Sequence, residues 1–417
     1  MIKQAVSAIL ALGLALGSGS VAPNNRDLTG KLERNEITPT EISAPEYQQK
    51  NPKEELTQFS LELMQQEFEQ NNLLISPLSI LSALGMTMNG AKGETLAQME
   101  QVFHTEKDDL NEYLYSYLHQ LPSSKESKIN LANSVWIRDE KGLKVKKDFL
   151  QTALDYYDSQ IYKEPFNNST KKKINDWVKK ETDGMIPKVL EEAPPKDAMM
   201  YLVNALSFDG KWSNPYFEHQ VWDGTFTTES GEKQDVTFMG GEQYGYIRLE
   251  NASGFGKPYK GGAYEFVALL PDEGVSMQEF LSTLDAEEMM QAVKNRQKKN
   301  VQTKMPKFSA EYNSNLNESL MTLGMTDAFD FGKADFSLMA SSSRGNLFIS
   351  NVIHKTKIDV NEQGTKAGAA TVVEMCAEAA IEGEKPKEVF LDRPFFYMIV
   401  DCEQNFPIFM GCLMQAE

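Results

Sequence analysis

Three short and nearly unbroken apolar runs constrain the fold of this chain more than any other feature. They are residues 199–208 (MMYLVNALSF), 395–402 (FFYMIVDC) and 408–414 (IFMGCLM). Runs of this length without regular polar alternation are typical of strands that are covered on both faces. The chain has 417 residues, but it shows no internal repeat and no linker between the runs. The sequence therefore predicts one large mixed domain, although a length prior of about 150 residues per domain suggests two or three.

Helical and strand periodicities alternate over the rest of the chain. Apolar residues at helical spacing predict helices at residues 56–70, 79–89, 93–103, 147–157, 169–182 and 275–297. Further strands are expected at residues 129–137, 264–270, 304–308 and 357–361, and Gly-rich turns separate strand-like segments within residues 222–272. The sequence predicts an α+β fold.

The N-terminus has the pattern of a secretory signal. Lys3 precedes a short apolar run at residues 5–17, and small residues follow it up to Ala22. We expect residues 1–22 to be a signal peptide, residues 23–53 to be a flexible polar leader, and residues 54–417 to form the domain. The protein is then exported, to the periplasm or to the extracellular medium. Nothing beyond the N-terminus is apolar enough to span a bilayer.

Charge and motif content exclude several function classes. The formal net charge is −18, which opposes binding to a phosphate backbone. None of the four histidines stands in a metal-ligand spacing, and there is no GxSxG, GxxxxGK[ST] or strand-linked GxGxxG motif. Three cysteines, Cys376, Cys402 and Cys412, are too few for a disulfide framework. We expect no enzyme activity, no metal, no cofactor and no nucleic acid partner.

A segment near the C-terminus carries the strongest functional signal. About 30 residues before the strand at 395–402 lack a clear element of their own, and loops longer than about 15 residues are usually functional or disordered. From Thr365 the segment alternates with period two. One face is small or apolar (Thr365, Ala367, Ala369, Thr371, Val373, Met375, Ala377), and all three charges fall on the other face. This pattern predicts a strand with one buried side, although a small-residue linker with chance alternation is an open alternative.

Residues 362–371 (EQGTKAGAAT) resemble the reactive-loop hinge of the serpin family. Further motifs in the family's order are residues 72–80 (NLLISPLSI), 90–95 (GAKGET), 133–136 (NSVW), 174–178 (INDWV), 202–205 (LVNA), 210–212 (GKW), 393–395 (RPF) and 409–411 (FMG). The resemblance covers residues 54 to 415. It implies a serpin-like fold of three β-sheets with eight or nine helices and an exposed reactive-centre loop at about residues 362–390.

The resemblance also implies a conformational mechanism. A serine endopeptidase, or a cysteine endopeptidase as a second target class, attacks the loop and forms an acyl-enzyme. The cleaved loop inserts into the central sheet as a new strand, and deacylation stalls. The mobile hinge is then Glu362, Gly364, Thr365, Ala367, Ala369 and Ala370. The polar cluster under the opening sheet is Ser76, Ser79, Asn204 and His354, and Trp212 resembles the packing residue where the loop first enters.

The serpin resemblance implies a range of positions for the scissile bond, whereas it implies single residues for the hinge. The family's spacing from the hinge acid falls on Glu378–Ala379, while counting back from Pro394 gives a site a few residues later. We expect cleavage between residues 375 and 381, with Ala377, Ala380 and Ile381 as alternative sites. The target would be an elastase-like or glutamate-specific protease.

Three functions compete at this stage. The first is a suicide-type protease inhibitor that acts as a monomer. The second is a non-inhibitory binding protein with the same fold, which bulky or charged residues on the buried hinge face would favour; that face has none. The third is an exported hydrolase, which the missing catalytic motifs oppose. The first reading is preferred.

Overall fold

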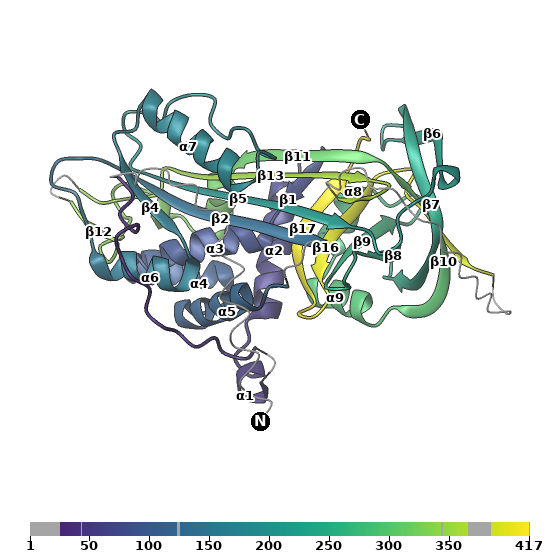
Figure 1. The fold of residues 1–417 in the computed structure, drawn as a ribbon, viewed down its shortest axis with the longest axis horizontal. Helices are drawn as coiled ribbons and strands as arrows, with labels where there is room; N and C mark the ends of the chain where they lie inside the picture. The colour runs from purple at the N-terminus through teal and green to yellow at the C-terminus, as the bar shows by residue number, and fades with distance from the viewer. Residues whose placement is uncertain (1–25, 43, 123–125, 343–344, 366–384, 417) are drawn as a thin grey trace.

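The computed structural model describes residues 26–42, 44–122, 126–342, 345–365 and 385–416 (Figure 1). They form the α+β fold that the sequence predicts. The expected signal peptide, at residues 1–22, lies outside the described residues.

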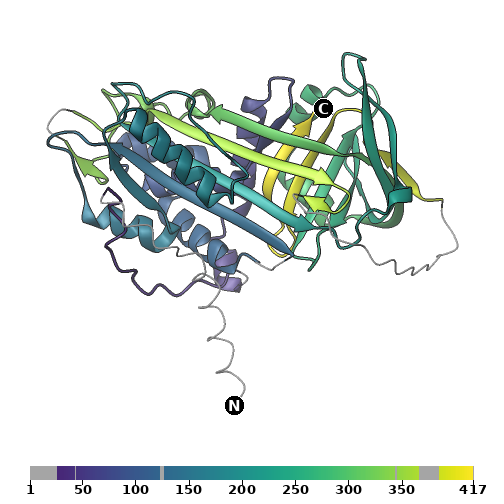
Figure 2. The ribbon, with the colours of Figure 1, turned by 45° about the horizontal axis from the view of Figure 1, so that its top comes forward.

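A six-stranded sheet, sheet A, runs through the molecule with α7 (Asn168–Glu181) on one face and α3 (Pro77–Met88) on the other (Figures 1 and 2). Its order is β11 (Phe308–Asn315), β13 (Asn351–Asn361), β14 (Gly364–Thr365), β5 (Met200–Lys211), β2 (Ser127–Arg138) and β4 (Gln160–Glu164). Because helices cover both faces, β5 is buried continuously from Met200 to Phe208, as its apolar run predicts.

The other strands form two further sheets that share the long strand β7 (Lys233–Arg248). Sheet B contains β1 (Leu73–Ile75), β17 (Phe406–Leu413), β16 (Phe395–Asp401), β9 (Tyr264–Pro271), β8 (Ala252–Pro258) and the end of β7. Sheet C contains β6 (Val221–Thr227), the first part of β7, β10 (Gln297–Pro306) and β15 (Lys387–Phe390). A small ribbon joins β3 (Lys144–Val145) to β12 (Ala340–Ser341). Apart from this ribbon, the described strands give the three sheets expected.

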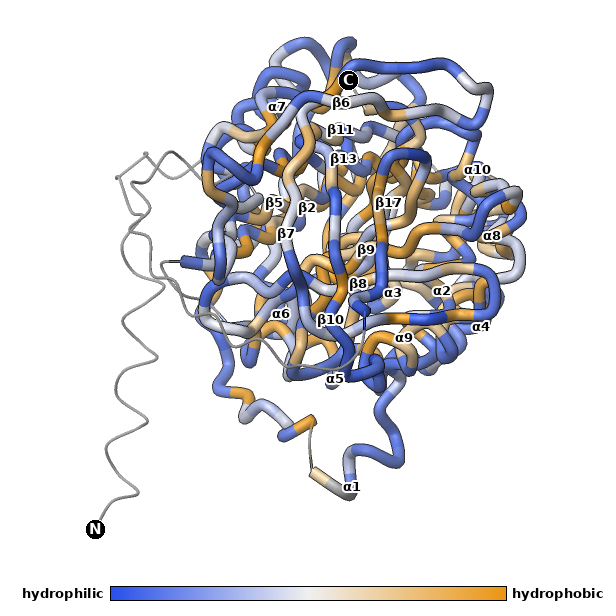
Figure 3. Tube along the Cα trace, turned by 90° about the vertical axis from the view of Figure 1, so that its right-hand side faces the viewer, coloured by the Kyte–Doolittle hydropathy of each residue, from blue (hydrophilic) through white to orange (hydrophobic). Residues whose placement is uncertain are grey.

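Nine helices, α2 to α10, lie within the described part of the domain. Besides α3 and α7 they are α2 (Lys53–Glu67), α4 (Gly93–Phe103), α5 (Lys107–Gln120), α6 (Lys147–Tyr157), α8 (Met277–Thr283), α9 (Ala286–Lys294) and α10 (Asn317–Leu323). A single turn, α1 (Pro45–Gln48), precedes them. Every residue of α3 is buried, and Figure 3 shows apolar segments gathered inside the molecule. The core thus lies between sheet A, sheet B and the helices.

The predicted helix at residues 275–297 is wrong as a single element. The structure has two helices, α8 and α9, and Gln297 begins β10. The break has a local cause, because Leu284 is extended and the Asp285 side chain caps α9 by accepting a hydrogen bond from the Glu288 N–H at 2.8 Å.

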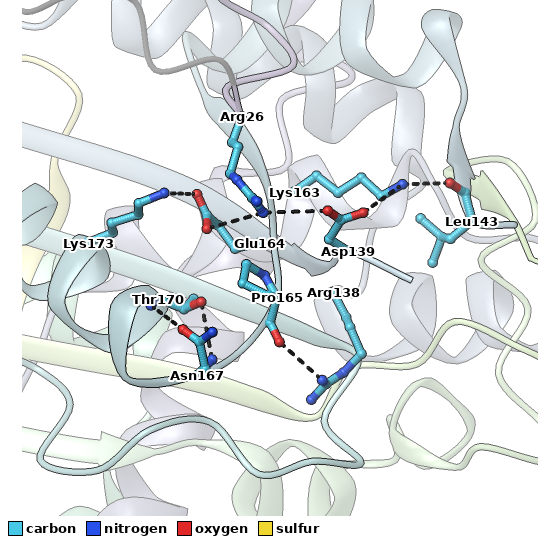
Figure 4. A network of polar contacts seen from close by, with 10 residues as sticks. All are labelled: Arg26, Arg138, Asp139, Leu143, Lys163, Glu164, Pro165, Asn167, Thr170 and Lys173. Atoms are coloured by element: carbon cyan, nitrogen blue, oxygen red, sulfur yellow. Dashed lines mark hydrogen bonds and ion pairs between the residues drawn. The ribbon is translucent and has the colours of Figure 1, made fainter. Parts of the chain in front are cut away.

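Part of the expected polar leader contacts the domain at β4. Backbone hydrogen bonds join Leu28 N–H to the Ile161 carbonyl at 2.8 Å and Lys163 N–H to the Arg26 carbonyl at 3.0 Å. Figure 4 shows the Arg26 guanidinium between carboxylates, 3.7 Å from the buried Glu164. A polar segment without apolar periodicity can still bind through its backbone, so no pattern of side chains predicts these contacts.

Candidate functional site

A tight turn joins β13 to β14, and both strands belong to sheet A. Thr365 pairs with Val360 of β13 and, on its other side, with Gly210 of β5. Both pairings are antiparallel. The first residues of the predicted loop are therefore already a strand between β13 and β5, and the described part of the loop is not free of structure. Its far end is also a strand, because β15 pairs with β10 in sheet C.

Close backbone approach explains the glycine at the start of β14. A Cβ atom on Gly364 would lie 2.0 Å from the carbonyl oxygen of Gly210. No side chain fits there without moving the hinge away from β5. Two residues before Gly364, Glu362 makes an ion pair with Lys307 at 2.9 Å. The hydrogen bond from Lys307 is the main cause that lowers the pKa of the Glu362 carboxyl.

Two aromatic residues after β5 hold the hinge backbone. Trp212 donates its backbone N–H to the Gln363 carbonyl at 2.9 Å and its indole N–H to the Asn361 carbonyl at 2.8 Å. Tyr216 donates its backbone N–H to the Glu362 carbonyl at 2.9 Å. Three consecutive hinge carbonyls therefore have donors from one short segment.

The side chain of Thr365 is fully buried at the end of sheet A. Its hydroxyl lies 2.6 Å from the hydroxyl of Tyr259, and Tyr259 stacks on Trp212 with ring centroids 4.5 Å apart. A short polar side chain is thus enclosed between aromatic rings. A longer or charged side chain at this position has neither space nor an ionic partner.

A second cluster lies under sheet A, between β13, β5 and α3. His354 Nδ1 lies 2.6 Å from Asn204 Oδ1, and Nε2 accepts the Ser76 N–H at 3.1 Å. Ser79 donates its hydroxyl to Asn204 Oδ1 at 2.9 Å and its N–H to the Ser76 hydroxyl at 3.3 Å. These contacts fit a neutral imidazole that carries its proton on Nδ1. Burial lowers the pKa of His354 to about 3.

The cluster lies at the seam between β13 and β5. Below β14, strands β13 and β5 pair directly and in parallel, in seven residue pairs from Asn351–Tyr201 to Lys357–Ser207. His354 and Asn204 are one of these pairs. A strand that continues from β14 would run antiparallel to both neighbours and would separate all seven pairs.

The structure thus brings Ser76, Ser79, Asn204 and His354 into one network. Trp212, which we grouped with them, lies at the hinge, where it binds the carbonyls of Gln363 and Asn361. Glu362 lies in the turn after β13, and Gly364 and Thr365 form β14. Ala367, Ala369, Ala370, Ala377, Glu378, Ala379, Ala380 and Ile381 lie outside the described residues.

Sequence reasoning missed three residues of the site: Tyr216, Tyr259 and Lys307. Tyr216 follows Trp212 closely, which was a usable signal. Tyr259 and Lys307 come from distant parts of the chain, and nothing local in the sequence links them to the hinge. Within the described part of the chain, no group of His, Cys, Asp or Glu side chains is placed to hold a metal ion. No described helix is long and apolar enough to cross a membrane.

Comparison with known proteins gives the class of this fold and site. The model of the family described as serpin (serine protease inhibitor) matches residues 54–416, so the chain belongs to the serpin family. Leukocyte elastase inhibitor A of Mus musculus is 32% identical over 377 residues, which cover 85% of this chain and 97% of the relative. An uncharacterized serpin-like protein of Thermococcus kodakarensis is 28% identical and covers 83% of this chain and 81% of its own.

Solved structures match this fold as well. The native state of a thermophilic serpin, tengpin, matches with a TM-score of 0.87 at 42% identity, covering 93% of this chain and 99% of that one. Its latent state matches with a TM-score of 0.77 at the same identity, covering 92% and 100%.

Proposed function

We propose that the protein is a suicide-type inhibitor of serine endopeptidases, with cysteine endopeptidases as a second target class. The enzyme cleaves the loop and is held as an acyl-enzyme while the loop inserts between β13 and β5. One observation carries this proposal: β14 already lies between these strands and is antiparallel to both. The loop needs only to extend an existing pairing.

The register supports a net gain on insertion. β13 and β5 share one ladder of seven residue pairs. An inserted strand replaces that single ladder with two, one on each of its sides. At about 1 kcal/mol net per ladder hydrogen bond, the gain over this stretch is about 7 kcal/mol, before the cost of ordering the loop. The expected direction is therefore towards the inserted form.

The target and the scissile bond remain as the sequence predicts. We propose cleavage at Glu378–Ala379, or at a neighbouring bond within residues 375–381, by an elastase-like or glutamate-specific protease. Leukocyte elastase inhibitor A is named for such an enzyme, which supports the first of the two. We further propose a monomer that is exported through the signal at residues 1–22. N-terminal sequencing of protein recovered outside the cytoplasm tests the export.

The alternative is a non-inhibitory serpin-fold binding protein. Human thyroxine-binding globulin matches with a TM-score of 0.77 at 23% identity, a likeness that concerns the fold alone. The small and apolar face of the hinge favours inhibition over this alternative.

One gel separates the candidate functions. The protein is incubated with an elastase and then denatured in SDS. An inhibitor gives an adduct that survives denaturation, a binding protein is only cleaved, and a hydrolase turns over substrate. Mass spectrometry of the released peptide locates the cleaved bond, and cleavage only outside residues 375–381 contradicts the assignment. Absence of the adduct with serine and cysteine proteases of several specificities contradicts the proposed function.

A further inference from the structure

A lysine without an acidic partner is buried beneath the hinge. Lys257 of β8 is 2% exposed, and its Nζ donates a hydrogen bond to the Asn214 carbonyl at 2.9 Å. The same atom lies 4.0 Å from the ring centroid of Tyr216 and 5.4 Å from that of Trp212. In the part of the chain that the structure describes, no carboxylate is within ion-pair distance of it. Buried lysines normally have such a partner, so this one calls for an explanation.

The two rings that Lys257 touches belong to the residues that hold the hinge. Trp212 binds the carbonyls of Asn361 and Gln363, and Tyr216 binds that of Glu362. The Lys257 amine therefore contacts both residues whose N–H groups bind three consecutive hinge carbonyls. These carbonyls belong to the segment that must move when the loop inserts.

We propose that Lys257 is a positioning residue of loop insertion: uncharged, it completes the packing under Trp212 and Tyr216 and keeps the hinge closed, and its protonation favours hinge opening. The inference rests on the proposed function for its biological meaning. The opening itself can be measured on the isolated protein.

The surroundings of Lys257 supply the physical reason. Burial lowers the pKa of the Lys257 amine to about 7, far below its usual range. The closed site thus disfavours the charged form, and the two rings offset only part of the lost hydration. An opening that admits water restores the amine's ordinary proton affinity, so opening takes up a proton.

The direction of the pH dependence of hinge opening follows from this uptake of a proton. Opening becomes less favourable as the pH rises from about 7 towards about 10, by at most about tenfold per pH unit for one proton. Below about pH 7 the amine is charged in both states, and the dependence levels off.

The other groups around Lys257 do not account for such a dependence. Burial raises the pKa of the Tyr216 phenol, so this group stays neutral. Pro258 pairs with Glu265, and the Glu265–Arg296 ion pair lies on the opposite face of β8, where a Cβ on Gly256 would meet it. Phe266, the register partner of Lys257, is uncharged. At the hinge, Glu362 pairs with Lys307, and Lys211, the register partner of Gly364, pairs with Glu126.

The test is hydrogen exchange of the intact protein, read on the peptide that contains the Trp212 and Tyr216 amides and corrected for the intrinsic pH dependence of exchange. Lys257→Met fixes an uncharged side chain at the site, and Lys257→Arg fixes a charged one. Lys304→Met is a matched control, because Lys304 also lies over aromatic rings, at 4.6 Å from Phe238, but is paired with Asp392. His219→Gln controls for the imidazole that stacks on Phe217.

We expect the wild-type hinge opening to fall at least about tenfold between about pH 7 and about pH 9. Lys257→Met should show the low opening of the wild type at high pH throughout, Lys257→Arg the high opening at low pH, and both controls the wild-type profile. A flat wild-type profile, or a pH dependence that survives in Lys257→Met, overturns the proposal. If either variant fails to fold, the other variant decides alone.

Complex formation keeps the two proposals apart. If the wild-type protein forms no SDS-resistant adduct but the exchange profile behaves as expected, the proposed function fails and the role of Lys257 in hinge opening stands. If the adduct forms and the profile is flat, the inference about Lys257 fails alone.

Discussion

On the proposed mechanism, Thr365→Arg should convert the protein from an inhibitor into a substrate. Thr365 is fully buried, its hydroxyl lies 2.6 Å from that of Tyr259, and its neighbours on β13 and β5 are Val360 and Gly210. An arginine there would be a buried charge without a partner, which costs several kcal/mol. Before cleavage, the two-residue β14 can leave the sheet and expose the arginine to solvent, whereas insertion has to bury it. If about 4 kcal/mol of the burial cost falls on the barrier to insertion, insertion slows about a thousandfold. Deacylation then wins, and the loop is cleaved without trapping the enzyme.

The assay is the SDS gel, which gives the ratio of adduct to cleaved protein, with Thr365→Val as the matched control. Valine has a similar size and loses only the hydrogen bond to Tyr259, worth about 1 kcal/mol, so most of the adduct should remain. Circular dichroism before cleavage checks that Thr365→Arg is folded, as expected because β14 has only two residues. Adduct formation by Thr365→Arg at the wild-type ratio would refute the reasoning.

Three further predictions follow from the site. Because burial lowers the pKa of His354 to about 3, the native state should lose stability as the pH falls from about 6 to about 3; thermal melting against pH should show this loss, and His354→Asn should reduce it. Glu362→Gln breaks a partly exposed ion pair with Lys307, so it should lower the free energy of unfolding by about 1 kcal/mol or less; a much larger loss in denaturant titration would contradict this. Gly364→Ala should lower it by about 1–3 kcal/mol, because its Cβ would lie 2.0 Å from the Gly210 carbonyl oxygen; an unchanged unfolding midpoint would show that the hinge does not need this approach.

Much of the fold could be predicted from the sequence because single segments carried their own signals. The apolar run at residues 199–208 gave β5, and the predicted helices at 93–103 and 147–157 agree with α4 and α6. The split between α8 and α9 was missed, although Asp285 and Glu288 have the spacing of a helix start. Periodicity over the whole window outweighed that local signal.

The sequence predicted some residues of the hinge, but, Trp212 apart, it did not predict the residues that contact the hinge from elsewhere in the fold. The resemblance of residues 362–371 to the serpin hinge marked Gly364 and Thr365, and the period-two alternation begins at Thr365. Tyr259, Lys307 and Lys257 contribute through contacts between distant parts of the chain, and neither periodicity nor composition records such contacts. The contacts of residues 26–28 with β4 were inaccessible for a related reason, since they use backbone groups that every residue has.

The most direct test compares the thermal unfolding of the intact protein with that of the same protein after a single cut in the loop. If the cut loop becomes a strand between β13 and β5, a gain of up to about 7 kcal/mol should raise the melting temperature by several degrees, up to about 10 °C for a domain of this size. The loop must be fully cleaved in this comparison. A melting temperature that is unchanged or lower after the cut would mean that no strand is added. The inhibitory mechanism would then be wrong for this protein.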